Sequence, residues 1–349
     1  MSLISPELVA TAQKRIAPFI HKTPLVTSTL LNGWLGSEVY FKCENLQKAG
    51  AFKIRGALNV GLKLKEQNKL PKHFVAFSSG NHAQAVALTG RMLGVRTTVV
   101  LPGYTTEVKK QATRAYGAEV IETRTRQETE IIALELKEKG AYLIPPFDSD
   151  DVIEGQGTAA FEALEQLKDS ADISPDAIFA ACGGGGLLSG TYLAKELLSP
   201  NTQIYGTEPK ICNDAGISFR TGKIFRFAET QMSIAEGART LAVGERTFEH
   251  LKKLNGFFEV EESDIIYWTQ WLMHLLKLTI EPTSAVAMGG AVQWLAAQPR
   301  GQKIIVMLSG GNLGADTYRK LWENDRLGEM PTLPVPEIFH HYINHLNIK

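Results

Sequence analysis

Short apolar runs alternate with amphipathic stretches along most of the chain, and this alternation limits the folds open to it. Strand-like runs at 73–77, 97–101, 177–181, 203–206 and 303–308 are separated by helical patterns such as 83–93, 157–167 and 187–197. Parallel strands need long crossover connections, which helices usually supply. The pattern therefore predicts an α/β fold with open, mostly parallel sheets covered by helices.

The charge balance and the composition limit the kinds of molecule that this protein is expected to bind. The 349 residues hold 37 Lys and Arg against 37 Asp and Glu, without a block of like charge, which disfavours nucleic acid and acidic membranes. No apolar run reaches the length of about 18 residues that a membrane-spanning helix needs. The three scattered cysteines lack CxxC spacing, and the amino terminus lacks a signal-like core. We expect a cytoplasmic protein with a small substrate.

Three predicted strands end in glycine-rich segments: 78–84 (SSGNHAQ), 182–190 (CGGGGLLSG) and 308–314 (LSGGNLG). Ligands of open α/β sheets bind where strands end and helices begin. The run from Gly183 to Gly186 stands before a helical pattern, so its N–H groups can surround an anion at a helix amino terminus. A flexible turn is the plainer interpretation, but four consecutive glycines favour a phosphate cradle.

A dinucleotide site is a remote alternative. Its G-x-G-x-x-G/A fingerprint would begin at Gly184, with Glu208 as the ribose-binding acid, and would make the protein a nicotinamide-dependent dehydrogenase. Ser189 stands at the last position of that fingerprint, and Lys53 would be unexplained. Lys53 lies between Phe52 and Ile54 at a predicted helix start, where apolar neighbours favour a neutral amine that can form a Schiff base. Taken alone, a lysine is more often a solvated charge.

Four motifs occur in a recognisable order: AFKIRGA, SSGNHAQ, the four glycines and LSGGN. Between about residues 16 and 321, the chain resembles the fold type II pyridoxal-phosphate enzymes, and within them the threonine/serine dehydratase and serine racemase family. The resemblance implies a two-lobed, tryptophan synthase β-like fold and a homodimer. It also implies a large cofactor-binding domain (1–47 plus 147–325), a small substrate-side domain (48–146) and a carboxy-terminal arm (326–349).

The same resemblance implies roles for individual residues. Lys53 would carry pyridoxal 5′-phosphate as a Schiff base and remove the substrate α-proton. The other cofactor contacts would come from Phe52, Asn81, Gly183, Gly184, Gly185, Gly186, Leu187, Gly237 and Ser309, with Ser309 at the pyridine nitrogen. Glu281 would form part of the active-site wall. The substrate carboxylate would lie in the loop formed by Ser78, Ser79, Gly80, Asn81 and His82.

A divalent-cation site is implied at the segment EPKICND. Its ligands would be Glu208, the Cys212 carbonyl and Asp214. Ligand sets made of oxygen alone suit Mg²⁺ or Ca²⁺. Two acids in a surface loop would be the plainer interpretation of this spacing without the resemblance.

A serine, rather than a carboxylate, at the pyridine nitrogen leaves the ring a weaker electron sink, which suits β-elimination. The resemblance thus implies a hydroxy amino acid ammonia-lyase of L-threonine/L-serine dehydratase type, acting in amino acid metabolism. Ser79 leaves serine racemase open as an alternative, because family racemases have serine there; threo-3-hydroxyaspartate dehydratase is a further alternative. Phe147 favours a dehydratase. The roughly 30 residues after Leu321 are too few for a regulatory domain, which indicates a catabolic type.

Overall fold

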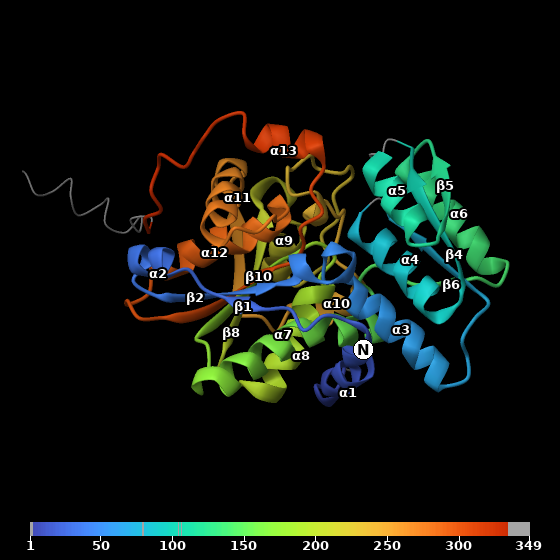
Figure 1. Ribbon diagram of the computed structural model, residues 1–349, viewed down its shortest axis with the longest axis horizontal. Helices are drawn as coiled ribbons and strands as arrows, with labels where there is room; N and C mark the ends of the chain where they lie inside the picture. Colours follow the sequence, from blue (N-terminus) through green and yellow to red (C-terminus); the bar gives the residue numbers. More distant parts are fainter. Residues whose placement is uncertain (1–2, 79, 104, 106, 334–349) are drawn as a thin grey trace, which may run out of the picture.

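The computed structural model describes residues 3–78, 80–103, 105 and 107–333. Two sheets lie side by side, each with helices against its faces (Figure 1). The larger sheet has the order β1-β2-β10-β7-β8-β9, and the smaller has the order β5-β4-β3-β6. All pairings between these strands are parallel except that of β1 with β2. The predicted fold class is confirmed.

The elements have the following bounds. The strands are β1 (Leu25–Val26), β2 (Glu38–Cys43), β3 (His73–Phe77), β4 (Arg96–Pro102), β5 (Glu119–Thr123), β6 (Tyr142–Leu143), β7 (Ala177–Ala181), β8 (Gln203–Pro209), β9 (Gly256–Val260) and β10 (Lys303–Leu308). The α-helices are α1 (Glu7–Ile16), α2 (Thr29–Leu35), α3 (Lys53–Glu66), α4 (Asn81–Leu93), α5 (Glu107–Ala115), α6 (Arg126–Glu138), α7 (Asp150–Ala171), α8 (Gly186–Leu198), α9 (Asp214–Thr221), α10 (Glu245–Leu251), α11 (Glu262–Leu276), α12 (Pro282–Ala296) and α13 (Ala315–Leu321).

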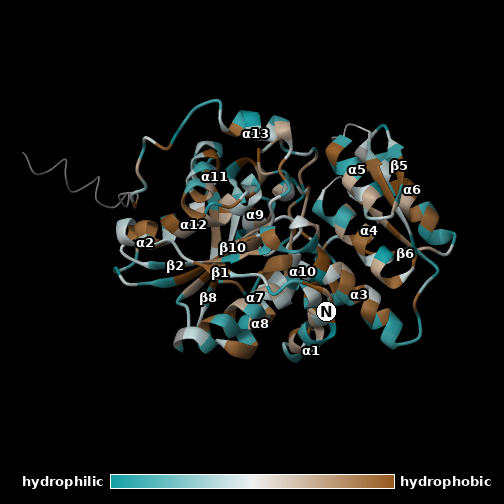
Figure 2. Ribbon diagram, in the orientation of Figure 1, coloured by the Kyte–Doolittle hydropathy of each residue, from teal (hydrophilic) through white to brown (hydrophobic). Residues whose placement is uncertain are grey.

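Both faces of the larger sheet are covered. Residues of α2, α11 and α12 pack on one face, where the rings of Phe179, Tyr205 and Trp294 meet. Residues of α7, α8 and α10 pack on the other face. Because both faces are buried, β7 (AIFAA) is apolar throughout, and every one of its residues is buried. Figure 2 shows apolar residues along the strands and on the inner sides of the helices.

The strands of the smaller sheet lie in sequence between β2 and β7. Residues of α3 and α4 pack against one another and against β3, and those of α6 lie with β3 and β4. This connectivity agrees with the two-lobed prediction, whose domain boundaries stay a prediction. None of the helices in the described part of the chain is long and apolar enough to cross a membrane.

Candidate active site

Lys53 is the first residue of α3. Its ammonium donates a hydrogen bond to the Pro146 carbonyl, with 2.8 Å between the two atoms. The Lys53 Nζ also lies 5.1 Å from the centre of the Phe52 ring. Burial lowers the pKa of Lys53 from 10.5 to about 8, while the charge of Glu281 opposes this shift. A substantial fraction of the amine is therefore neutral at mildly alkaline pH, as a nucleophilic lysine requires.

The start of α3 is attached to the end of β10. Ala51 forms an isolated antiparallel bridge with Gly310, and the Phe52 N–H donates to the Ser309 carbonyl at 3.1 Å. The buried Ser309 hydroxyl lies 3.3 Å from that of Ser284. These contacts bring two sequence-predicted residues, Lys53 and Ser309, to the same edge of the larger sheet.

The four glycines lie between β7 and the start of α8, where the surrounding atoms leave no space for side chains. Gly185 has φ +91°, in the left-handed region that favours glycine. A Cβ atom on Gly184 would lie 2.2 Å from the Phe147 ring, and one on Gly183 would lie 2.6 Å from the Gly237 carbonyl oxygen. The first N–H groups of a helix have no partner within the helix, so those of Gly186 and Leu187 are available to an anion. The geometry fits the predicted phosphate cradle.

A polar cluster joins α4 to the larger sheet. The Asn81 amide donates to both carboxyl oxygens of Glu281 at 3.0 Å and accepts from the Asn312 amide at 2.8 Å. Burial raises the pKa of Glu281 to about 6, against the hydrogen bond from Asn81. The LSGGN motif contains Asn312, but the sequence assigned it no role. Its contact with Asn81 could not be foreseen, because 231 positions separate them.

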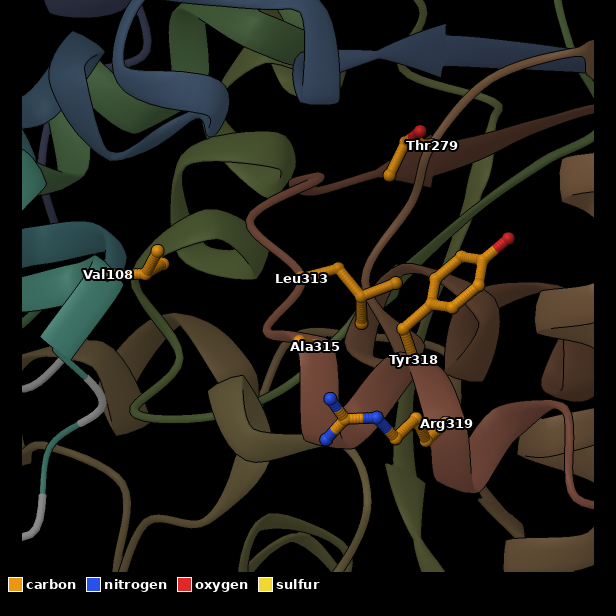
Figure 3. A pocket seen from close by; sticks show the side chains of 6 residues that line it. All are labelled: Val108, Thr279, Leu313, Ala315, Tyr318 and Arg319. Atoms are coloured by element: carbon orange, nitrogen blue, oxygen red, sulfur yellow. The ribbon is translucent and has the colours of Figure 1, made fainter.

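The described residues also form an open pocket. It is lined by Val108, Thr279, Leu313, Ala315, Tyr318 and Arg319. Figure 3 shows Val108 of α5 on one side, with Leu313 and the residues of α13 opposite it. Leu313 directly follows Asn312, and Thr279 lies two positions before Glu281, so two lining residues are sequence neighbours of the polar cluster.

The expected substrate loop is described in part. The Gly80 N–H donates to the Ser78 hydroxyl at 3.2 Å. His82 is buried, with its Nε2 2.9 Å from the Ile144 carbonyl oxygen. Burial and the charge of Lys53 lower the pKa of His82 to about 3, so this imidazole is neutral near pH 7. Ser79 lies outside the described residues.

The acids of the predicted cation site are buried together. Glu208, on β8, is fully buried and accepts the N–H groups of Ala215 and Gly216 at 3.0 and 2.7 Å. Neither carboxyl oxygen of Asp214 has a hydrogen-bond partner of ordinary geometry among the described residues, although the nearby Val243 backbone and Thr240 hydroxyl act to lower its pKa. Burial raises the pKa of Asp214 to about 7; burial and Asp214 raise the pKa of Glu208 well above its usual range. The described residues contain no group of three or more His, Cys, Asp or Glu side chains that could hold a metal ion.

A buried lysine with a lowered pKa, together with a glycine run at the carboxyl end of a parallel strand, is typical of enzymes that bind a phosphorylated aldehyde cofactor. The chain belongs to the pyridoxal-phosphate dependent enzyme family, whose model matches residues 16–310. The L-threo-3-hydroxyaspartate ammonia-lyase of Saccharomyces cerevisiae is 42% identical over 90% of this chain and 94% of its own length. The serine racemase of Schizosaccharomyces pombe is 40% identical over 89% of this chain and 94% of its own length.

Solved structures agree with this assignment. The serine racemase of Dictyostelium discoideum superposes with a TM-score of 0.82 and 37% identity, covering 90% of this chain and 100% of its own. A threonine deaminase from T.th. superposes with a TM-score of 0.84 and 41% identity, covering 89% of this chain and 99% of its own. The predicted family is thereby confirmed, and with it pyridoxal-phosphate dependence. The family match leaves the dinucleotide interpretation of Gly184 and Glu208 without support.

Proposed function

We propose that this enzyme is an ammonia-lyase that converts small L-3-hydroxy amino acids to 2-oxo acids and ammonia. The position of Lys53 carries the proposal: its amine has a lowered pKa and donates to the carbonyl of Pro146, whose neighbour Phe147 packs against Gly184. The ammonia-lyases of Saccharomyces cerevisiae and of a Pseudomonas species, 42% and 40% identical, are both named for L-threo-3-hydroxyaspartate. That compound is therefore the first substrate to test, followed by L-serine and L-threonine.

The protein side chains support elimination as follows. When bound, pyridoxal phosphate withdraws electrons from the substrate α-carbon. Lys53 would form the covalent link to the cofactor and accept the α-proton, which requires the neutral amine that burial favours. Ser309 would face the ring nitrogen. Because a hydroxyl leaves that nitrogen largely neutral, departure of the β-hydroxyl is favoured over accumulation of charge on the ring.

Racemisation is the second candidate activity. Ser79 supplies a hydroxyl in the loop where family racemases have serine, and the Schizosaccharomyces pombe relative is a serine racemase. A racemase needs a second proton donor, on the substrate face opposite the lysine. A Ser79→Ala variant should then lose D-serine formation and keep 2-oxo acid formation.

The activity assay separates these candidates. Purified enzyme is incubated with each of the three substrates; 2-oxo acid is measured by reduction with a coupled dehydrogenase, and the remaining amino acid is resolved by chirality. We expect 2-oxo acid from at least one substrate and none with Lys53→Ala. Protein that holds pyridoxal phosphate but forms no 2-oxo acid from any of them would contradict the lyase proposal.

We further propose that Glu208, the Cys212 carbonyl and Asp214 bind Mg²⁺ or Ca²⁺. Two buried carboxyl groups, one of them with no hydrogen-bond partner of ordinary geometry in the described residues, need either a proton or a cation. A cation that binds the native state alone raises its stability by about 2.7 kcal/mol at 100 times its dissociation constant. Heating chelator-treated protein with and without Mg²⁺ or Ca²⁺ tests this. If the wild type unfolds at the same temperature with and without the cation, and Asp214→Asn also unfolds at that temperature, the proposal is contradicted.

The homodimer and the cytoplasmic location stay predictions. Sedimentation of the purified enzyme would test the first, and localisation of a tagged chain the second.

A further inference from the structure

The phosphate cradle is held from outside by a short helix. The Gly184 carbonyl accepts the Thr247 hydroxyl at 2.7 Å and the Gly244 N–H at 3.4 Å, and both donors belong to the start of α10. A peptide unit is planar and trans, so its C=O and N–H groups point in opposite directions. Holding the Gly184 oxygen toward α10 therefore turns the Gly185 N–H away from α10. This N–H is one of the donors of the predicted cradle.

The Thr247 side chain is in turn fixed by its place in α10. Thr247 is fully buried, and its hydroxyl also lies 3.1 Å from the Gly244 carbonyl oxygen. A Cβ atom on Gly185 would lie 3.0 Å from the Cβ of Thr247, so helix and cradle are in close contact. A small shift of the first turn of α10 would move the hydroxyl that orients the cradle.

The first turn of α10 has an unusual cap. Its N-cap residue, Gly244, has no side chain to bond the free N–H groups of the helix. The helix is capped instead by Asp148, which lies almost 100 positions earlier in the chain. Its Oδ1 accepts hydrogen bonds from the N–H groups of Arg246 at 2.8 Å and Thr247 at 3.1 Å. A Cβ atom on Gly244 would lie 2.1 Å from the same oxygen. Gly244 thus leaves the space that the Asp148 carboxylate occupies.

The neighbours of Asp148 contact the other half of the site. The Pro146 carbonyl accepts the Lys53 ammonium, and the Phe147 ring packs against Gly184. Three consecutive residues therefore connect the parts of the site: Pro146 contacts the reactive lysine, Phe147 contacts the glycine run, and Asp148 caps α10.

We propose that Asp148 is a positioning residue for the cofactor phosphate, acting through Thr247 on the Gly184–Gly185 peptide. This inference rests on the proposed role of Gly183 to Leu187 as the phosphate cradle. It predicts that loss of the Asp148 carboxylate or of the Thr247 hydroxyl weakens recognition of the phosphate group in particular. A cap with a purely structural role would weaken the binding of every form of the cofactor alike.

The experiment compares two ligands of the same apoprotein. Pyridoxal 5′-phosphate and pyridoxal are titrated separately and followed by absorbance. Phosphate recognition is measured as the dissociation constant of pyridoxal divided by that of pyridoxal 5′-phosphate. In Thr247→Val and Asp148→Ala we expect this ratio to fall about tenfold or more, the scale of one hydrogen bond to a charged group. Thr247→Ser and Asp148→Asn keep the bonding oxygen and should stay close to the wild-type ratio.

A control comes from the same surface. The Asp150 side chain pairs with the side chain of Arg246, whereas Asp148 bonds the backbone of α10, so Asp150→Asn should leave the ratio unchanged. If Thr247→Val and Asp148→Ala weaken both ligands equally, the positioning role is refuted. If Asp148→Ala fails to fold, the pair Thr247→Val and Thr247→Ser decides the matter. A wild-type protein that binds both ligands equally would refute the cradle itself, a different failure.

Discussion

Removing Glu44 should destabilise the protein strongly, because Glu44 belongs to a buried cluster of four balanced charges. Arg55, in the first turn of α3, donates to its two carboxyl oxygens at 2.7 and 2.8 Å, and neither side chain is exposed. Arg55 also contacts Glu162 at 3.1 Å, and Glu162 pairs with Lys42 at 2.6 Å. Burial alone would lower the pKa of Arg55, but Glu44 and Glu162 outweigh it and raise that pKa.

The size of the effect follows from the charge count. Glu44→Gln leaves Arg55 and Lys42 facing Glu162 alone, a net buried positive charge. Breaking a buried ion pair by removing one partner typically costs about 3–5 kcal/mol. We expect a loss of this size in equilibrium urea unfolding, followed by circular dichroism. Glu66→Gln is the matched surface control: Glu66 is 56% exposed and pairs with Arg15, so its loss should cost less than about 1 kcal/mol.

A double variant tests the charge argument directly. Lys42→Met added to Glu44→Gln restores a balanced pair of Arg55 and Glu162, so the double variant should lose less stability than the sum of the two single losses. A loss below about 1 kcal/mol for Glu44→Gln, or strictly additive losses in the double variant, would refute the reasoning.

Three further predictions concern the site. The rate at which the apoprotein takes up pyridoxal phosphate should rise with pH and level off through a midpoint near 8, since burial lowers the pKa of Lys53 and the neutral amine reacts; a stopped-flow midpoint near 10.5 would contradict this. Burial raises the pKa of Glu281 to about 6, and its carboxylate accepts two hydrogen bonds from the Asn81 amide. Protonation should weaken this contact, so activity should fall as the pH drops through 6, and this acidic limb should be missing from the pH profile of Glu281→Gln; identical profiles of the two enzymes would contradict the prediction. Gly184→Ala places a methyl group 2.2 Å from a ring and should cost about 1–3 kcal/mol of stability as well as cofactor affinity, whereas Gly33→Ala, with open space around it, should not; equal unfolding temperatures for the two variants would show the contact to be unimportant.

Local patterns predicted much of the fold. The strands at 73–77, 177–181 and 303–308 have the predicted bounds, because each is an apolar run ended by polar or glycine residues. α7 begins at Asp150, about two turns before the helix predicted at 157–167, and it contains Gly155 and Gly157. They serve close packing: a Cβ atom on Gly157 would lie 2.7 Å from the Gly190 carbonyl oxygen in α8. Tertiary packing overrides the helix propensity there.

Lys53 and the glycine run could be proposed from the sequence because each lies in a short motif of consecutive residues, and their roles stay predictions. The sequence gives no signal for contacts between distant segments. Asn81 and Glu281 are 200 positions apart. The helix α10 has a glycine at its N-cap position, so the sequence does not reveal that Asp148 caps this helix. Three-dimensional proximity alone reveals these partners.

The central claim is that Lys53 carries the cofactor, and borohydride reduction followed by peptide mapping tests it most directly. The purified enzyme is reduced in the presence of pyridoxal phosphate and digested, and the modified peptide is sequenced by mass spectrometry. We expect one phosphopyridoxyl group, on Lys53. A label on any other lysine, or no label on protein that contains the cofactor, would contradict the account.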